Sequence, residues 1–277
     1  MALALMYITN NPEVAVIAQE CGVNRIWIDL ETLGKELRQK NFDSVKSHHS
    51  IEDIKRIKPL LATSEMLVRV NSWNENSAEE IDSVIAAGAD LVMLPMWEDV
   101  GTVKNFVQAV NKRAKTVLLL ETRGAEACLD EVLKLSGIDE IHIGLNDLHI
   151  QYGMKFMFEL LANGTIDRLC KKISGAGLPY GFGGIAKLGY GDVPAELVIS
   201  EHYRLGSTRA ILSRAFCDAT KINDIDEVRR IFREESGRLR DYEVKASQFT
   251  ADEFEINRKK LAESVMTVVA GKARNCV

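Results

Sequence analysis

The stretch EMLVRVNSWNENSAEEIDSVIAAGADLVMLPM, residues 65–96, contains the pattern that decides the fold. It begins and ends with short, largely apolar runs, and residues 77–88 between them have the spacing of an amphipathic helix. Ser77 followed by Glu80 is typical of a helix start. The stretch therefore predicts two strands joined by a crossover helix, which makes the strands parallel neighbours.

The same alternation of apolar strand and amphipathic helix runs along most of the chain. Near-continuous apolar strands are typical of a parallel sheet that is buried on both faces, and eight strand–helix units predict a closed (β/α)8 TIM barrel of the α/β class. A doubly wound open sheet is the alternative, and it is disfavoured because no GxGxxG motif opens the first turn. Strands are expected at residues 2–8, 24–31, 65–71, 90–96, 115–121, 140–147, 179–186 and 203–212.

The C-terminal segment differs in character from the rest of the chain. Residues 1–220 carry the strand–helix alternation, whereas residues 221–277 are highly charged and have helical spacing. We therefore predict a barrel over residues 1–220 and a helical extension over residues 221–277. This extension is expected to pack on the barrel or on a partner subunit.

Composition and charge exclude several classes of function. The 277 residues carry a net charge of −5 with a pI of about 5.7, and no basic patch of the kind that binds nucleic acid is visible. No apolar run reaches the roughly 18 residues that a membrane span requires. Five cysteines lie far apart without a CxxC pair, which argues against a zinc site and favours reduced thiols in the cytoplasm.

Polar residues gather where the expected strands end, which is where barrel enzymes carry their chemistry. Glu121 and Asp147 end the fifth and sixth strands, and two such carboxylates repel each other unless a cation lies between them. Oxygen ligands of this kind favour Mg²⁺ or Mn²⁺. Arg69, on an otherwise apolar strand, needs an anionic partner. The alternative is purely structural: Asp147 caps the next helix, and Glu121 pairs with Arg69 or Arg123.

Three of these segments together resemble a known family. Residues 67–96, the segment LLLETRGA at 118–125 and the segment EIHIGLNDLH at 140–149 are similar to the HpcH/HpaI aldolase and citrate lyase β family, over about residues 7 to 217. The resemblance implies a phosphoenolpyruvate/pyruvate-type TIM barrel. It also implies dependence on a divalent metal, a small 2-oxo acid substrate, and a homo-oligomer in which the C-terminal extension is exchanged between subunits.

The resemblance also implies roles for individual residues. Glu121 and Asp147 would bind Mg²⁺ or Mn²⁺, and Arg69 would contact the pyruvyl oxygen of the substrate and take part in catalysis. The backbone amides of the turn after the sixth strand would hold the substrate carboxylate. The residues implied to bind substrate are Arg69, Glu31, Gly144, Leu145 and Asn146.

Two positions depart from the family pattern and put the proton transfer in doubt. Thr32 stands where the family has a histidine base, and Leu119 stands where the family has a glutamine. This chain therefore looks like a member of a subgroup without the usual base. His48 and His49, in the loop after the second strand, are candidates to replace that base, because a neutral imidazole accepts protons near pH 7. The alternative is that both are solvent-exposed loop residues.

The remaining histidines are given other roles. His149, just after the metal-binding aspartate, is a second candidate base. His142 alternates onto the other face of its strand and is expected to be structural, and His202 is expected on the surface or at an interface.

The glycines near the last two strands leave a further alternative open. Barrels often bind phosphate through backbone amides after strands seven and eight, so Gly183, Gly184 and the segment 206–208 suggest a phosphorylated substrate, with Lys187 or Arg209 as countercharge. The same glycines are equally explained by tight packing.

These observations predict a metal-dependent carbon–carbon lyase of the aldolase type, which acts on a 2-oxo acid through a pyruvate enolate. Two alternatives remain. The same enolate site could serve a condensing enzyme or synthase, or the barrel could bind a metabolite without catalysis.

Overall fold

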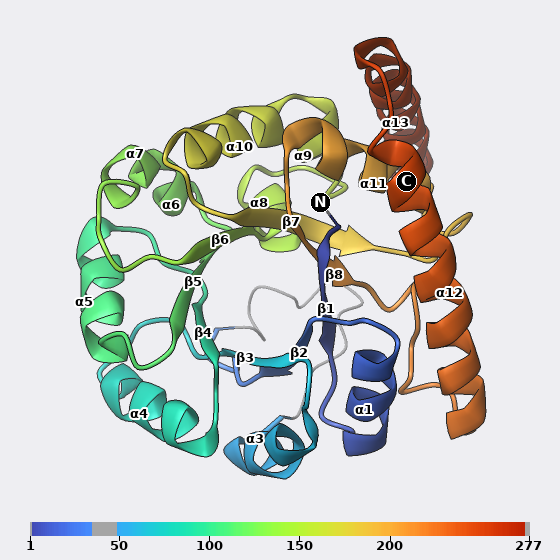
Figure 1. Cartoon of the computed structure of the whole chain (residues 1–277). Coiled ribbons are helices and arrows are strands. Elements are labelled where there is room, and N and C mark those ends of the chain that lie inside the picture. Colours follow the sequence, from blue (N-terminus) through green and yellow to red (C-terminus); the bar gives the residue numbers. More distant parts are fainter. Residues whose placement is uncertain (1, 35–48, 275–277) are drawn as a thin grey trace. The chain divides into compact units, whose positions relative to one another are not determined.

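The computed structural model describes residues 2–34 and 49–274. Its eight strands form a closed barrel in the order β1 to β8, with helices between successive strands and two long helices at the C-terminus (Figure 1). The predicted (β/α)8 barrel is confirmed, and the doubly wound alternative is excluded. The strands are β1 (Ala4–Ile8), β2 (Arg25–Asp29), β3 (Glu65–Arg69), β4 (Leu91–Leu94), β5 (Lys115–Leu120), β6 (Glu140–Ile143), β7 (Tyr180–Ile185) and β8 (Arg209–Leu212).

The chain divides into two compact parts. The N-terminal part is Met6–Ile141, and the C-terminal part combines Met1–Leu5 with His142–Val277. The domain boundary expected after residue 220 stays a prediction.

Parallel pairing sets the register of the strands in the N-terminal part. Ile26 of β2 pairs with Met66 of β3, and Val68 of β3 pairs with Val92 of β4. All four side chains are buried, as expected for strands covered on both faces. The helices of this part are α1 (Pro12–Glu20), α3 (Ile51–Ile57), α4 (Ser77–Ala87), α5 (Val100–Val110), α6 (Arg123–Ala127) and α7 (Leu129–Val132), with a short 3₁₀ helix at Lys58–Leu60.

The start of α4 differs in detail from the prediction. The N-cap is Asn76 rather than Ser77. Ser77 Oγ instead accepts a hydrogen bond from the Asn74 backbone N–H at 2.8 Å, and the Glu80 carboxylate turns back to Asn71. The capping pattern located the helix correctly, but its two side chains are used to hold the loop before the helix.

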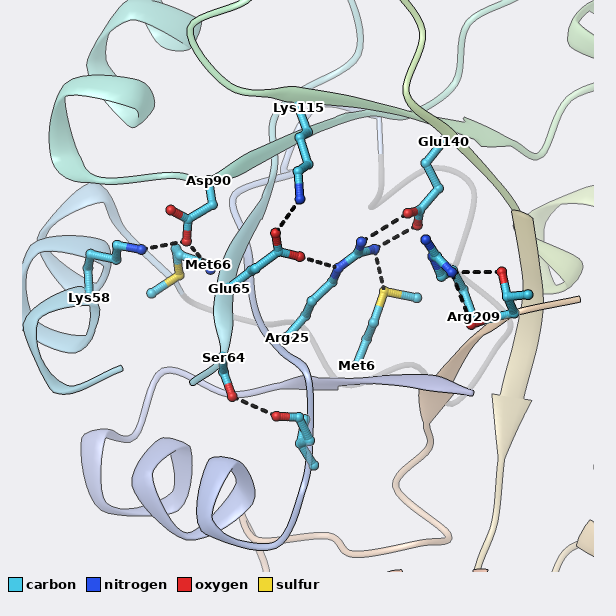
Figure 2. A network of polar contacts seen from close by, with 12 residues as sticks. Met6, Arg25, Lys58, Ser64, Glu65, Met66, Asp90, Lys115, Glu140 and Arg209 are labelled. Carbon is cyan, nitrogen blue, oxygen red and sulfur yellow. Dashed lines mark hydrogen bonds and ion pairs between the residues drawn. The ribbon is translucent and has the colours of Figure 1, made fainter. Parts of the chain in front are cut away.

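A network of charged side chains joins the amino-terminal ends of four strands in the N-terminal part (Figure 2). The Arg25 guanidinium donates to both oxygens of Glu140 at 2.7 and 2.9 Å, and its Nε donates to Glu65 at 3.1 Å. Lys115 donates to the other oxygen of Glu65 at 2.5 Å. Burial by itself lowers the pKa of Arg25, but its hydrogen bonds and the charges of Glu140 and Glu65 raise that pKa above its ordinary value. These ion pairs connect the amino-terminal ends of β2, β3, β5 and β6.

The C-terminal part is built around its last helices. The α12 helix buries Phe232 against Phe216, with ring centroids 5.7 Å apart. Its buried Glu243 accepts from the Leu3 backbone N–H at 2.7 Å and from the Tyr203 hydroxyl at 3.0 Å. These contacts attach the extension to the first strand segment and to α11. The helices of this part are α8 (Leu145–Gln151), α9 (Glu159–Ala162), α10 (Thr165–Gly175), α11 (Ala195–Leu205), α12 (Ile225–Ala246) and α13 (Ala251–Arg274).

His202 does not lie on the surface, contrary to the prediction. It is fully buried on α11, its ring stacks on Phe182 with centroids 3.9 Å apart, and its Nδ1 lies 2.8 Å from Ser207 Oγ. Burial lowers the pKa of His202 to about 3. His202 is therefore a neutral core residue.

Two further expectations concern thiols and membranes. The four cysteines that the structure describes are free thiols: Cys21, Cys128, Cys170 and Cys217. Among the helices described here, none has both the length and the apolar composition needed to cross a bilayer.

Candidate functional site

Arg69, at the carboxyl end of β3, is enclosed by carboxylates. Its Nε and Nη2 atoms donate to the two oxygens of Asp29 at 2.9 and 2.8 Å, and its Nη1 atom lies 3.2 Å from Glu31 Oε2. The Arg69 side chain is 12% exposed and both acids are buried. The guanidinium carbon lies over the Trp27 ring, 5.5 Å from its centre, so a cation–π contact also holds it. The structure thus brings together the predicted residues Arg69 and Glu31.

Nearby carboxylates act strongly on the Arg69 guanidinium. Burial by itself lowers the pKa of Arg69, but the charges of Asp29, Glu31 and Glu121 and the hydrogen bonds to Asp29 raise it well above its ordinary value. In formal charge, three carboxylates face one guanidinium. Buried carboxylates are oxygen ligands of the kind that a hard divalent cation prefers.

Glu121, which directly follows β5, is 2% exposed, and its Oε1 accepts a hydrogen bond from the Met96 backbone N–H at 3.1 Å. Met96 has a φ of 53°, a left-handed conformation that is uncommon for a residue with a side chain. Backbone strain of this kind persists where the surrounding structure enforces it, and it is frequent at functional sites. Here the unusual backbone aims an N–H group at the predicted metal ligand.

Thr32, which the resemblance predicts to stand where the family has a histidine, is held by Asn71. The Asn71 side-chain oxygen accepts from the Thr32 backbone N–H at 2.9 Å and from the Thr32 hydroxyl at 3.3 Å. The Thr32 hydroxyl is therefore engaged, and it lacks the basicity of an imidazole.

One of the two candidate bases is visible at the end of β2. His49 Nδ1 accepts a hydrogen bond from the Asp29 backbone N–H at 3.0 Å. In the neutral ring this places the proton on Nε2, so Nδ1 of His49 can accept a proton only by giving up that bond. His48 lies outside the described residues. A catalytic role for either histidine stays a prediction.

The turn after β6 belongs to the C-terminal part. Gly144 is the N-cap of α8, and the first amide to donate within that helix is that of Leu148, to Gly144 O at 3.1 Å. The backbone amides of Leu145 and Asn146 therefore precede the helical hydrogen bonds, as amides that bind anions at a helix start do. Asp147 lies in the first turn of α8. Substrate binding by this turn and metal binding by Asp147 stay predictions.

His149, the second candidate base, is buried on α8, and its Nδ1 lies 3.2 Å from the Leu145 carbonyl oxygen. Burial lowers its pKa below the ordinary histidine value. A neutral, buried His149 is explained by packing.

The phosphate alternative loses most of its support in the structure. Gly206 ends α11 with a φ of 71°, so residues 206–208 precede β8 instead of following it, and Arg209 lies at the amino end of that strand. Gly183 is explained by packing, because an added Cβ would lie 2.7 Å from Leu145 Cδ1. Lys187 Nζ lies over the Tyr190 ring at 4.0 Å.

The donor set can be compared with what a divalent metal requires. No group of three or more metal-ligating side chains occurs within residues 2–34 and 49–274. A hard cation such as Mg²⁺ is commonly bound by one or two carboxylates, with water and substrate oxygens completing its shell. The buried carboxylate of Glu121, whose charge acts on Arg69, is a ligand of this kind.

Sequence reasoning did not assign two residues that the structure places in the site. These residues are Asp29, the bidentate partner of Arg69, and Asn71, which holds the turn after β2. The pairing of Asp29 follows from the register of the parallel strands β2 and β3, which sets Asp29 beside Arg69. No local motif indicates the contacts of Asn71.

Comparison with known structures supports the fold. An HpcH/HpaI aldolase from Desulfitobacterium hafniense DCB-2 is 14% identical, with a TM-score of 0.58, and the match covers 76% of this chain and 86% of that chain. An HpcH/HpaI aldolase/citrate lyase family protein from Burkholderia cenocepacia J2315 is 12% identical, with a TM-score of 0.60 and coverage of 82% and 95%. The citrate synthase SbnG is 16% identical, with a TM-score of 0.58 and coverage of 89% and 96%.

A search of curated proteins finds no match. The sequence model of the HpcH/HpaI aldolase/citrate lyase family matches residues 3–159, which is more than half of the chain. The closed eight-stranded barrel and this match agree with each other, and the chain belongs to the HpcH/HpaI aldolase/citrate lyase family.

Proposed function

We propose that this protein is a divalent-metal-dependent carbon–carbon lyase that cleaves a 4-hydroxy-2-oxo acid through a pyruvate enolate. The observation that carries the proposal is the largely buried Arg69 guanidinium among three carboxylates. A site of this kind can hold a cation and a small oxo acid together. Family membership supports the same class of chemistry.

Arg69 would stabilise the negative charge that develops on the substrate. Asp29 accepts hydrogen bonds from the Arg69 Nε and Nη2 atoms and so fixes the plane of the guanidinium group, while Glu31 Oε2 lies 3.2 Å from Nη1. A guanidinium has five N–H donors, so this arrangement leaves donors for the oxygen at carbon 2 of the substrate. Prepositioned donors of this type commonly contribute several kcal/mol to a transition state.

In the cleavage step, a base takes the proton of the 4-hydroxyl group, the bond between carbons 3 and 4 breaks, and its electron pair forms the enolate. An aldehyde leaves, and the enolate takes a proton from water to give pyruvate. Glu121 and Asp147 would hold Mg²⁺ or Mn²⁺, which would polarise the 2-oxo acid when bound. Gly144, Leu145 and Asn146 would bind its carboxylate, and His48 or His49 would supply the base.

A condensing enzyme is the second candidate, because an enolate held in this site can attack an acceptor carbonyl instead of being formed by cleavage. The similarity to the citrate synthase SbnG favours this candidate. A homo-oligomer in the cytoplasm is part of either proposal.

The test measures exchange of the pyruvate methyl protons with deuterium from the solvent. The reaction contains Mg²⁺ or Mn²⁺ and is monitored by proton NMR. We expect metal-dependent exchange in the wild type and a loss of roughly 100-fold or more in Arg69→Met. Arg113→Met is the matched control, since Arg113 is half-exposed and pairs with Asp82 on the surface. Addition of an aldehyde or oxo-acid acceptor then separates the two candidates by the product formed. Absence of exchange with every divalent metal would leave a non-catalytic metabolite-binding barrel.

A further inference from the structure

Asn71 joins two elements of the N-terminal part at the edge of the proposed site. Its side-chain oxygen accepts from the backbone N–H groups of Thr32 at 2.9 Å and Leu33 at 3.0 Å. Its side-chain nitrogen donates to Glu80 Oε1 at 2.8 Å, and its backbone N–H lies 3.2 Å from the same oxygen. One amide thus connects the turn after β2 with α4.

The orientation of this amide is determined by its partners. Rotating it by half a turn would set its NH₂ group against the two N–H donors of Thr32 and Leu33, and its oxygen against the Glu80 carboxylate. Both arrangements would be repulsive. Burial raises the pKa of Glu80, and the hydrogen bonds from Asn71 oppose that effect. The Asn71 amide therefore has one favourable orientation, and we call its contacts with Thr32, Leu33 and Glu80 the clamp.

The clamp restrains the residue that faces Arg69. Immediately before Glu31, the Leu30 backbone N–H donates to the Arg69 carbonyl oxygen at 2.9 Å. Immediately after it, Thr32 is held by Asn71. Glu31 therefore lies between two fixed backbone points, and its carboxylate is presented to Nη1 of Arg69 at 3.2 Å.

We infer that Asn71, oriented by Glu80, is a positioning residue for the proposed reaction: it holds the turn that sets Glu31 against Arg69. The inference rests on the proposed function. It also gives Thr32 a role, because its backbone and hydroxyl both serve the clamp at the position where the family carries a histidine.

A pair of substitutions can reverse the polarity of the clamp. In Asn71→Asp, two carboxylates face each other at positions 71 and 80, and the turn should move. Glu80→Gln keeps an acceptor for Asn71 and is the matched control. In the double variant the new glutamine can donate to the new aspartate, whose other oxygen still accepts from Thr32 and Leu33, so that the hydrogen-bond pattern is restored.

Two readouts are measured on the intact protein with Mg²⁺ and pyruvate. The first is the kcat and KM of methyl deuterium exchange, and the second is amide hydrogen exchange at Thr32 and Leu33. For Asn71→Asp we expect kcat to fall roughly 10- to 100-fold with KM nearly unchanged, and both amides to exchange faster. The double variant should recover at least about tenfold of the lost rate and regain amide protection.

Two results would overturn the inference. One is wild-type turnover in Asn71→Asp; the other is a double variant that regains amide protection at Thr32 and Leu33 but not its rate. If Asn71→Asp does not fold, comparing the exchange rate and the amide protection of the double variant with those of Glu80→Gln still tests the inference. Failure of the proposed function is a different result, visible as absent pyruvate exchange in the wild type, and the amide data then decide whether the clamp exists.

Discussion

Replacing Arg69 with methionine should destabilise the protein strongly when no divalent metal is present. Methionine keeps an apolar stem over Trp27 but removes the guanidinium that pairs with two buried acids, Asp29 and Glu31. Removing one partner of a buried ion pair typically costs about 3–5 kcal/mol, because the remaining charge is left without compensation. The bidentate geometry at 2.8–2.9 Å and the 12% exposure of Arg69 place this pair in that class.

The free energy of unfolding can be measured by urea denaturation, with Arg113→Met as the control. Arg113 and Asp82 pair at 2.6 Å, but their side chains are 42% and 63% exposed, so we expect the control to lose less than about 1 kcal/mol. Mg²⁺ or Mn²⁺ should then restore part of the stability of Arg69→Met, since a ligand at 100 times its Kd stabilises the folded state by about 2.7 kcal/mol.

The reasoning is refuted if Arg69→Met is as stable as Arg113→Met in metal-free buffer. That result would mean that the carboxylates around Arg69 do not depend on its charge. If neither the wild type nor Arg69→Met becomes more stable when metal is added, the proposed binding of a divalent cation is contradicted as well.

Three further predictions concern stability. Glu140→Gln breaks the buried bidentate pair with Arg25 and should lower the free energy of unfolding in urea by about 3–5 kcal/mol. The Lys115 side chain in the same network is half-exposed, so Lys115→Ala should cost less than about 1 kcal/mol. Equal losses in the two variants would contradict this order. His202 has a folded pKa of about 3, below the unfolded value of 6.5, so its stabilising effect is complete above pH 6.5 and is lost as the pH falls. His202→Phe should therefore remove about 2 kcal/mol of the decline in stability between pH 7 and pH 5, and an unchanged decline would contradict the assignment. Gly181→Ala sets a Cβ 2.3 Å from a backbone oxygen of β8 and should cost about 3 kcal/mol or more, while Gly175→Ala meets no atom within 4 Å and should be nearly neutral by the same unfolding measurement.

The fold could be predicted from the sequence because each strand–helix unit carries its own local pattern. The run at residues 65–96 shows strand, helix start and strand within one segment, and the structure confirms β3, α4 and β4 there. Local patterns fail where a residue's surroundings come from distant parts of the chain. His202 is buried because its ring stacks on Phe182 of β7 and its Nδ1 lies beside Ser207, contacts that no pattern within its own helix indicates.

The candidate site could be predicted only in part, for the same reason. Glu31, Arg69 and Glu121 follow from strand ends and the family resemblance, since the ends of parallel strands meet at one edge of the sheet. The pairing of Arg69 with Asp29 depends on the register between β2 and β3, and the contacts of Asn71 join three segments through side-chain hydrogen bonds. No spacing within one segment encodes such contacts.

Calorimetric titration of Mn²⁺ into the metal-free protein in the presence of oxalate, with the wild type and Glu121→Gln compared, tests the central claim most directly. Oxalate imitates the enolate of pyruvate and so reports on the complete site. We predict one Mn²⁺ bound per chain in the wild type and an affinity at least about tenfold weaker in the variant. Equal affinity in the two proteins, or no heat of binding in the wild type at millimolar Mn²⁺, would contradict the account.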